Sequence, residues 1–213
     1  FLSPKIESKK FRTLVNAPSY YWYNHVKKPN ITSDVDEFSK LATQTVAEKR
    51  TCLRHDRLYS LFQAVFKLPK NSICIEIGVF QGGSSKFLGT LLRERGIDLY
   101  ACDTFTGHAE VDSAFDGGHE VNKGFSNVKL ENVKKYLCHL PNVKIVVGSI
   151  MDTWEQIPDE PIGMIHCDVD VYPATKFVLE KFWDRLIPGG MVVVDDYGFR
   201  TCGGCKKAVD QFS

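Results

Sequence analysis

The sequence predicts an α/β fold built on a mostly parallel, doubly wound sheet with helices on both faces. Two observations predict it: short continuous apolar runs alternate with helical patterns, and glycine-rich or acidic segments directly follow the runs. Strands that are apolar throughout are typical of parallel sheets, which helices cover on both faces. Ligands of such Rossmann-like sheets bind beyond the carboxyl ends of the strands.

The elements follow one another along the chain. Residues 34–68 show apolar residues at helical spacing and predict one or two helices that end before Pro69. Strands are expected at 73–77, 99–102, 143–147, 162–167 and 191–194. Further helices are expected at 84–95 (closed by Gly96), at about 130–137, and from Pro173 to about residue 186. A Pro-Gly-Gly turn at 188–190 is expected before the last strand.

Two parts of the chain differ in pattern. Residues 1–68 predict an N-terminal arm and helices that pack on the core, and residues 69–213 predict the ligand-binding domain. The arm contains an aromatic run, Tyr20 to Tyr23, which either packs against the protein or stacks on a ligand.

Composition narrows the class of protein. The chain has 213 residues and a formal net charge of +1, so no bulk attraction to nucleic acid or to an anionic membrane is expected. No apolar run approaches the roughly 20 residues of a membrane-spanning helix, and a cytoplasmic location is expected. The seven cysteines suit reduced thiols, and the Cys202-x-x-Cys205 pair is interpreted as part of a glycine-rich loop rather than a metal or redox site.

A glycine-rich turn, EIGVFQGGSS at 76–85, follows the first strand and opens a helix. A nucleotide-binding P-loop is improbable because Ser84 occupies the position of its lysine. The segment also lacks the second glycine of a dinucleotide-binding turn, because Phe80 stands at that position. A dinucleotide site nevertheless stays open as an alternative. The remaining pattern predicts a ligand held by Glu76, Gly78, Phe80, Gly82 and Ser84, with an anionic group near the helix N-terminus.

The next two strands end in polar residues. Asp103, followed by Thr104, stands where a carboxylate accepts hydrogen bonds from both hydroxyls of a ribose, unless it is only a turn or capping residue. Ser149 follows the third strand and is expected near an adenine on position alone.

Four acids follow the last two strands, in DVDVY at 168–172 and DDY at 195–197. If its strand continues, Asp168 and Asp170 point to the same side, and Asp195 and Asp196 reach the same edge from the neighbouring strand. Carboxylates this close repel one another, so a hard cation such as Mg²⁺ is the natural counterion. The alternative is that they are caps and surface acids.

Taken together, the segments EIGVFQGGS (76–84), DTFTG (103–107), DVDVYPAT (168–175), PGGMVVVDDYG (188–198) and CGGCKKAVD (202–210) resemble the macrocin O-methyltransferase family of class I methyltransferases. The resemblance covers roughly residues 50–213. It implies an enzyme that uses S-adenosylmethionine and Mg²⁺ to methylate a hydroxyl of a sugar or natural product.

The resemblance also assigns residues. Asp168, Asp195 and Asp196 look like the metal ligands of catechol O-methyltransferases, Asp168 would also border the cofactor, and Ser84 would contact the methionine carboxylate. A lysine or histidine that serves as general base in some relatives is Val171 here, so the resemblance leaves Asp170 or a metal ligand as the base. The loop at 104–126 would close over the substrate, with His108 and His119 either assisting or solvated.

The chain departs from the family at its ends. It stops at Ser213 within an expected helix, so the last strands of a seven-stranded sheet are expected to be missing. It begins with Phe1 in place of Met, which suggests a fragment. The expected partner is a small-molecule hydroxyl acceptor, and a homo-oligomer is possible. The alternatives are an NAD(P)-dependent oxidoreductase and a noncatalytic module that binds an adenosine ligand or a partner.

Overall fold

The computed structural model describes residues 13–16, 34–121 and 123–213, and within them it contains one six-stranded sheet. All neighbouring strands are parallel, in the order β1-β6-β5-β2-β3-β4, which confirms the predicted fold class. The strands are β1 (Thr13–Asn16), β2 (Ile73–Ile77), β3 (Leu99–Asp103), β4 (Val143–Val147), β5 (Ile162–Cys167) and β6 (Leu186–Val194).

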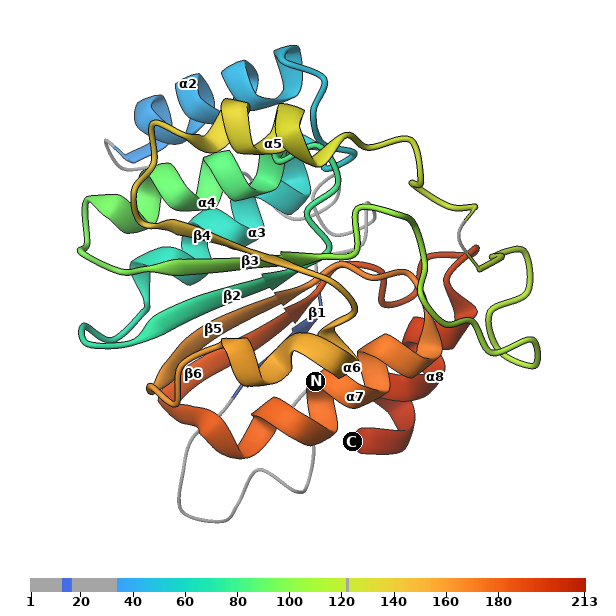
Figure 1. Cartoon of the computed structure of the whole chain (residues 1–213). Coiled ribbons are helices and arrows are strands. Elements are labelled where there is room, and N and C mark those ends of the chain that lie inside the picture. Colours follow the sequence, from blue (N-terminus) through green and yellow to red (C-terminus); the bar gives the residue numbers. More distant parts are fainter. Residues whose placement is uncertain (1–12, 17–33, 122) are drawn as a thin grey trace.

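Helices cover both faces of the sheet (Figure 1). One layer holds α2 (Asp34–Ala47), α3 (His55–Phe66), α4 (Gly83–Arg93) and α5 (Leu130–Leu137); the other holds α6 (Ile150–Thr153), α7 (Tyr172–Phe182) and α8 (Gly203–Phe212). Short 3₁₀ turns, Trp154–Gln156 and Trp183–Arg185, follow α6 and α7. The two helices α2 and α3 account for the helical pattern predicted at 34–68.

Each helix layer shares a hydrophobic core with the sheet. Every residue of β2 and β5 is buried, as expected for strands covered on both sides. Phe38 of α2 and Leu58 of α3 pack in the same cluster as Phe87 of α4. The other layer buries Phe182 of α7 and Val209 of α8.

Three features differ from the expectations. The Pro-Gly-Gly segment at 188–190 lies within β6 and forms an irregularity, because Ile162 of β5 pairs with Leu186 while Met164 pairs with Met191. The short helix α6 was not predicted. Residues 13–16, expected to belong to an arm, form β1 beside β6. The aromatic run Tyr20 to Tyr23 lies outside the described residues.

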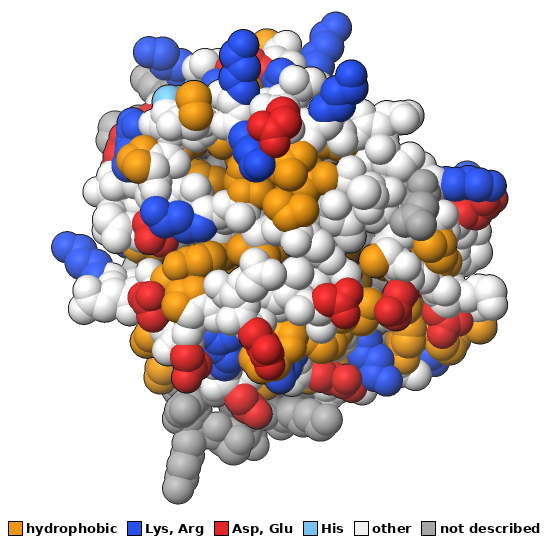
Figure 2. Space-filling view, in the orientation of Figure 1, with side chains coloured by type: hydrophobic (Ala, Val, Ile, Leu, Met, Phe, Trp, Pro, Cys, Tyr) orange, Lys and Arg blue, Asp and Glu red, His pale blue; other side chains and the backbone are white. Residues whose placement is uncertain are grey.

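The surface carries charges of both signs. On the face shown in Figure 2, basic side chains gather mainly over the upper helices and acidic side chains over the lower part, with hydrophobic patches between them. None of the helices in the described parts of the chain is long and apolar enough to cross a membrane.

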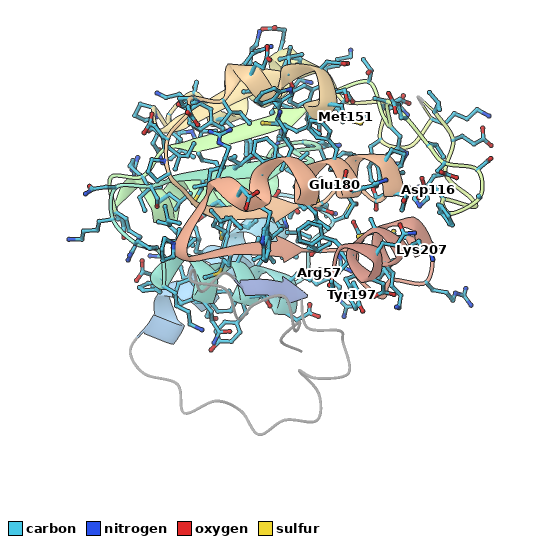
Figure 3. The ribbon with its side chains drawn as sticks, turned by 90° about the horizontal axis from the view of Figure 1, so that it is seen from below. Arg57, Asp116, Met151, Glu180, Tyr197 and Lys207 are labelled. Carbon is cyan, nitrogen blue, oxygen red and sulfur yellow. The ribbon has the colours of Figure 1, made fainter. Side chains whose placement is uncertain are left out.

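A long loop joins β3 to α5 and extends past the edge of the sheet toward α7 and α8 (Figure 1). Asp116 attaches it: the residue is 1% exposed, and its carboxylate accepts hydrogen bonds from the amides of Tyr172 and Asp112, each 2.8 Å away. The Tyr172 amide belongs to the first turn of α7, and Figure 3 shows the labelled Asp116 beside that end of the helix. Gly204 makes room for this carboxylate, because a Cβ there would lie 1.7 Å from Asp116 Oδ1.

Candidate active site

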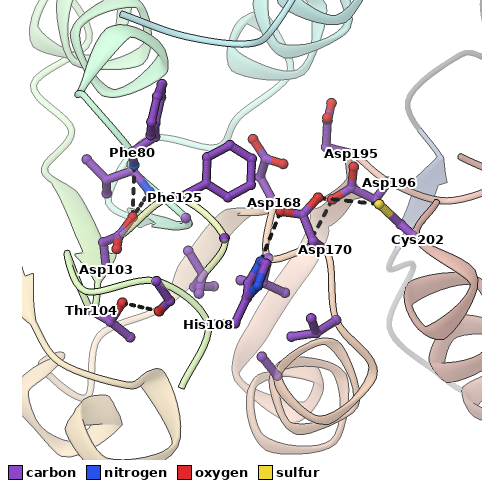
Figure 4. Close-up of a pocket in the computed structure, with 18 of the residues that line it drawn as sticks. Phe80, Asp103, Thr104, His108, Phe125, Asp168, Asp170, Asp195, Asp196 and Cys202 are labelled. Carbon is purple, nitrogen blue, oxygen red and sulfur yellow. Dashed lines mark hydrogen bonds and ion pairs between the residues drawn. The ribbon is translucent and has the colours of Figure 1, made fainter. Parts of the chain in front are cut away.

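A cavity of about 430 Å³ lies at the carboxyl ends of the strands (Figure 4). It is bounded by the glycine-rich turn after β2, the ends of β3 to β6, the first turn of α6 and the β3–α5 loop. The predicted site residues that line it are Gly78, Phe80, Ser84, Asp103, Thr104, Ser149, Asp168, Asp170, Asp195 and Asp196. The fold therefore brings ten of the predicted residues to one cavity.

Two residues predicted to bind the cofactor do not line this cavity. Glu76 is fully buried within the sheet, where its carboxylate accepts a hydrogen bond from Ser85 and lies 3.1 Å from His166 Nδ1. Gly82 has a left-handed φ of +87° and packs near Tyr136 and Val133. In this structure both residues belong to the glycine-rich segment but lie outside the cavity.

Asp103 fixes the glycine-rich turn. Its Oδ2 accepts hydrogen bonds from the amides of Val79 (2.7 Å) and Phe80 (2.8 Å), and its Oδ1 accepts one from the amide of Phe105 (2.7 Å). These contacts agree with the alternative interpretation of Asp103 as a turn residue. Because each carboxylate oxygen can accept more than one hydrogen bond, the predicted ribose contact stays a prediction alongside it.

The rest of this side of the cavity is formed by residues that follow β2, β3 and β4. Ser84, 3% exposed, stands in the first turn of α4, and Thr104 directly follows Asp103. Ser149 caps α6, because its hydroxyl accepts a hydrogen bond from the amide of Met151 at 3.3 Å. These residues surround one space with hydroxyls, a carboxylate and apolar side chains, as small-molecule sites commonly do.

Three of the acids form a tight group. One carboxylate oxygen from each of Asp168, Asp195 and Asp196 lies within 4.8 Å of the others. Asp195 and Asp196 are each 4% exposed. Burial, followed by the charges of Asp195 and Asp196, raises the pKa of Asp168 well above its usual value, and burial together with neighbouring acids raises that of Asp196 to about 7. The group therefore carries more negative charge than its surroundings balance.

Arg57 of α3 supplies a cation to this group. Its guanidinium forms an ion pair with Asp195 and lies 5.0 Å from the centre of the Phe199 ring. Burial acts to raise the pKa of Asp195, and the charges of His166 and Arg57 limit the rise. Arg57 pairs directly with only one of the three carboxylates.

Asp170 reaches the cavity by a route that the sequence did not predict. The strand β5 ends at Cys167, and Asp170 has a left-handed φ of +62°, so Asp168 and Asp170 do not lie along one extended strand. Its Oδ2 is 3.4 Å from His108 Nε2 and its Oδ1 accepts a hydrogen bond from Cys202 Sγ at 3.3 Å. Burial acts to raise the pKa of Asp170, but these two contacts lower it below its usual value.

The site thus contains residues that sequence patterns did not assign. Arg57 lies in the first turn of α3, far from the acids in sequence, and nothing in its pattern marks it. His108 was expected to assist or to be solvated, and the structure buries it against Asp170. Cys202, interpreted as a loop thiol, also contacts Asp170.

Comparison with known proteins gives a consistent picture. The family model "Macrocin-O-methyltransferase (TylF)" matches residues 12–213. A Streptomyces olivaceus protein named 8-demethyl-8-(2,3-dimethoxy-alpha-L-rhamnosyl)-tetracenomycin-C 4'-O-methyltransferase is 35% identical over 141 residues, which are 60% of this chain and 54% of that protein. Demethyldecarbamoylnovobiocin O-methyltransferase of Streptomyces niveus is 25% identical over 181 residues, covering 78% of this chain and 68% of that protein.

A solved structure agrees in fold. The structure of the O-methyltransferase NovP superposes with a TM-score of 0.63 at 22% identity, covering 84% of this chain and 88% of that one. The chain spans only about half the length of the first of these relatives. The family match, by contrast, covers nearly the whole chain, and the chain belongs to the macrocin O-methyltransferase (TylF) family.

Proposed function

We propose that this protein is an S-adenosylmethionine-dependent, Mg²⁺-assisted O-methyltransferase that acts on a hydroxyl of a small molecule, a sugar or another natural product. One observation carries the proposal: a group of three acids, two of them buried, stands in the same cavity as the glycine-rich turn and Asp103. A donor site and a charge-stabilising site are therefore adjacent, as a transfer reaction requires.

The cavity suits S-adenosylmethionine along its β2–β4 side. The Ser84 hydroxyl near the N-terminus of α4 suits the methionine carboxylate, and Asp103 suits the ribose hydroxyls. Ile150 and Met151, which line the cavity beside Ser149, give an apolar surface for the adenine. The turn lacks the glycine pattern of dinucleotide-binding folds, which weighs against NAD(P).

The three-acid group suits Mg²⁺. Asp168, Asp195 and Asp196 offer only oxygen ligands at short separation, the donor set that hard divalent cations prefer. Burial and the neighbouring acids raise the pKa values of Asp168 and Asp196, and a cation bound between them would favour their ionised forms. A cation bound there would act as a Lewis acid that lowers the pKa of the acceptor hydroxyl and orients it.

Asp170 is the base in this proposal. Its lowered pKa keeps the carboxylate ionised at neutral pH, so it can accept the proton of the acceptor hydroxyl as the oxygen takes the methyl group. The methyl group leaves the sulfonium as the new C–O bond forms, so the protein contributes chiefly alignment of the two reactants.

The substrates for which the relatives are named support the acceptor class. One is named for a rhamnosyl group on tetracenomycin and another for novobiocin, and both are named O-methyltransferases. For this chain we propose only the same class of acceptor, a hydroxyl of a glycoside or related natural product.

The test has two parts. Calorimetry should show binding of S-adenosylmethionine and S-adenosylhomocysteine, and no preference for NAD. A mass-spectrometric screen of glycosides, beginning with methyl α-L-rhamnoside, should detect products heavier by one methylene unit, and chelator should abolish transfer until Mg²⁺ is restored.

Other outcomes would point to the alternatives. Preferred binding of NAD would support an oxidoreductase, and cofactor binding that survives loss of the acid group, without transfer to any acceptor, would support a noncatalytic module. Full transfer in the presence of chelator would remove Mg²⁺ from the proposal and leave a metal-independent transferase.

A further inference from the structure

His108 connects the β3–α5 loop to Asp170 (Figure 4). The histidine side chain is 8% exposed, and its Nε2 lies 3.4 Å from Asp170 Oδ2. Among the described residues its Nδ1 is buried without a hydrogen-bond partner, so the hydrogen bond of this ring is the one with Asp170. A buried N–H rarely remains unpaired, which favours the ring form with its proton on Nε2, directed at the carboxylate.

Asp170 is held from two sides. Cys202 Sγ donates to one carboxylate oxygen and His108 contacts the other, while the Asp170 amide donates to Asp196 Oδ2 at 3.3 Å. A carboxylate with one partner can still turn about its last side-chain bond. Partners on both oxygens fix its plane, which matters because a base must lie within hydrogen-bond reach of the proton that it removes.

The His108 ring is itself fixed in place. It makes edge-to-face contacts with His119 and Phe125, with ring centres 5.0 Å and 6.0 Å apart. Gly124 leaves space for the ring, because a Cβ there would lie 2.4 Å from His108 Cε1. His119 Nε2 is 3.0 Å from the carbonyl oxygen of Thr201, the residue before Cys202. The loop therefore carries His108, one partner of Asp170, and contacts the residue beside Cys202, the other partner.

We propose that His108 is a positioning residue: with the β3–α5 loop in place, its Nε2–H holds Asp170 Oδ2 and sets the carboxylate in the orientation that takes the proton from the acceptor hydroxyl. This inference rests on the proposed function of the site and adds to it a loop residue outside the predicted set. It also makes the loop part of the machinery that aligns the base, in addition to covering the cavity.

Two nearly isosteric variants test it. In His108→Gln the amide nitrogen stands close to the place of Nε2 and can still donate to Asp170, whereas in His108→Asn it stands close to the place of Nδ1 and cannot reach. We expect His108→Asn to lower kcat by about tenfold or more, part of the range that a general base contributes, and His108→Gln to recover much of the loss. KM for S-adenosylmethionine and Mg²⁺ affinity should stay unchanged in both.

Controls separate positioning from general structure. His139→Asn changes an exposed histidine outside the cavity and should leave kcat unchanged. In the Asp170→Asn background, His108→Asn should cause little further loss, because the two residues act together. Equal losses in His108→Asn and His108→Gln, or additive losses in the double variant, would overturn the proposal.

A spectroscopic measurement needs no acceptor. Long-range ¹H–¹⁵N correlation spectra of the neutral ring should show His108 with its proton on Nε2, and Asp170→Asn should shift that signal. A neutral ring protonated on Nδ1, or a signal that Asp170→Asn does not change, would refute the contact. Failure of the wild-type protein to bind S-adenosylmethionine would instead refute the proposed function, so the two failures are distinguishable.

Discussion

Replacing Gly78 by alanine should destabilise the protein through a contact between two strands. The backbone at Gly78 has a φ of +96°, and a Cβ there would lie 1.8 Å from the carbonyl oxygen of Asp168. The strands approach so closely because the amide of Asp168 donates to the carbonyl of Ile77 at 2.8 Å, beyond the end of β5. The absence of a side chain at this position therefore keeps Asp168 in place.

The magnitude can be separated into two contributions with a matched variant. Gly96 also has a positive φ, +69°, but a Cβ there meets nothing within 4 Å. Gly96→Ala should then lose only about 1–2 kcal/mol of unfolding free energy, the cost of a left-handed conformation for a residue with a Cβ. Gly78→Ala adds an overlap with backbone atoms, typically worth about 1–3 kcal/mol more, for a total of about 2–5 kcal/mol.

Urea-induced unfolding followed by tryptophan fluorescence measures both variants. Because the overlap displaces Asp168, Gly78→Ala should also weaken Mg²⁺ binding in calorimetry, whereas Gly96→Ala should not. Equal destabilisation by the two substitutions would refute this reasoning. A Gly78→Ala protein of normal stability that loses only S-adenosylmethionine affinity would show instead that the glycine serves the approach of the ligand.

The remaining predictions concern carboxylates. Asp103→Ala should weaken S-adenosylmethionine binding by about 1–3 kcal/mol in calorimetry and also lower stability, because the amides of the turn lose their acceptor; unchanged affinity would exclude a role at the cofactor. Asp195→Asn should retain part of the Mg²⁺ affinity, since an amide oxygen still coordinates, and Asp195→Ala should retain less; identical titrations for wild type and both variants would place the metal elsewhere. Burial acts to raise the pKa of Glu48, but contacts with Lys86 and Tyr136 lower it below the usual 4.5, so its stabilising effect is present above that pH and is lost as the pH falls through the lower folded value. Unfolding curves between about pH 3 and 6 should therefore show the advantage of wild type over Glu48→Gln shrinking as the pH falls, and a constant difference would count against this assignment.

Much of the sheet was predictable because its signal is local. The run at 73–77 is buried on both faces, so every residue in it is apolar apart from Glu76, and the structure reproduces these bounds. The segments 143–147 and 162–167 likewise form strands with the predicted limits. The segment 188–190 misled because glycine and proline mark a strand irregularity as readily as a turn.

The composition of the site was predictable further than its geometry. Parallel strands bring their carboxyl ends to one edge, which is enough to assemble Asp168, Asp195 and Asp196. Which groups each acid contacts depends on segments remote in sequence. Arg57 and His108 reach the acids from a helix and a loop that have no periodic relation to the strands, so no sequence pattern could place them.

The attachment of the β3–α5 loop by Asp116 has a consequence for the population of open molecules. Because this carboxylate accepts a hydrogen bond from the first amide of α7, lifting the loop would leave a helix terminus uncapped. A capping interaction is worth about 0.5–2 kcal/mol, so if this contact alone closed the loop, the loop would be open in roughly 3% to 30% of molecules at any moment. Ligands would then enter and leave through these open molecules, and no separate event would be needed to open the loop. Asp116→Ala would raise the population of open molecules and lower the population in which His108 contacts Asp170.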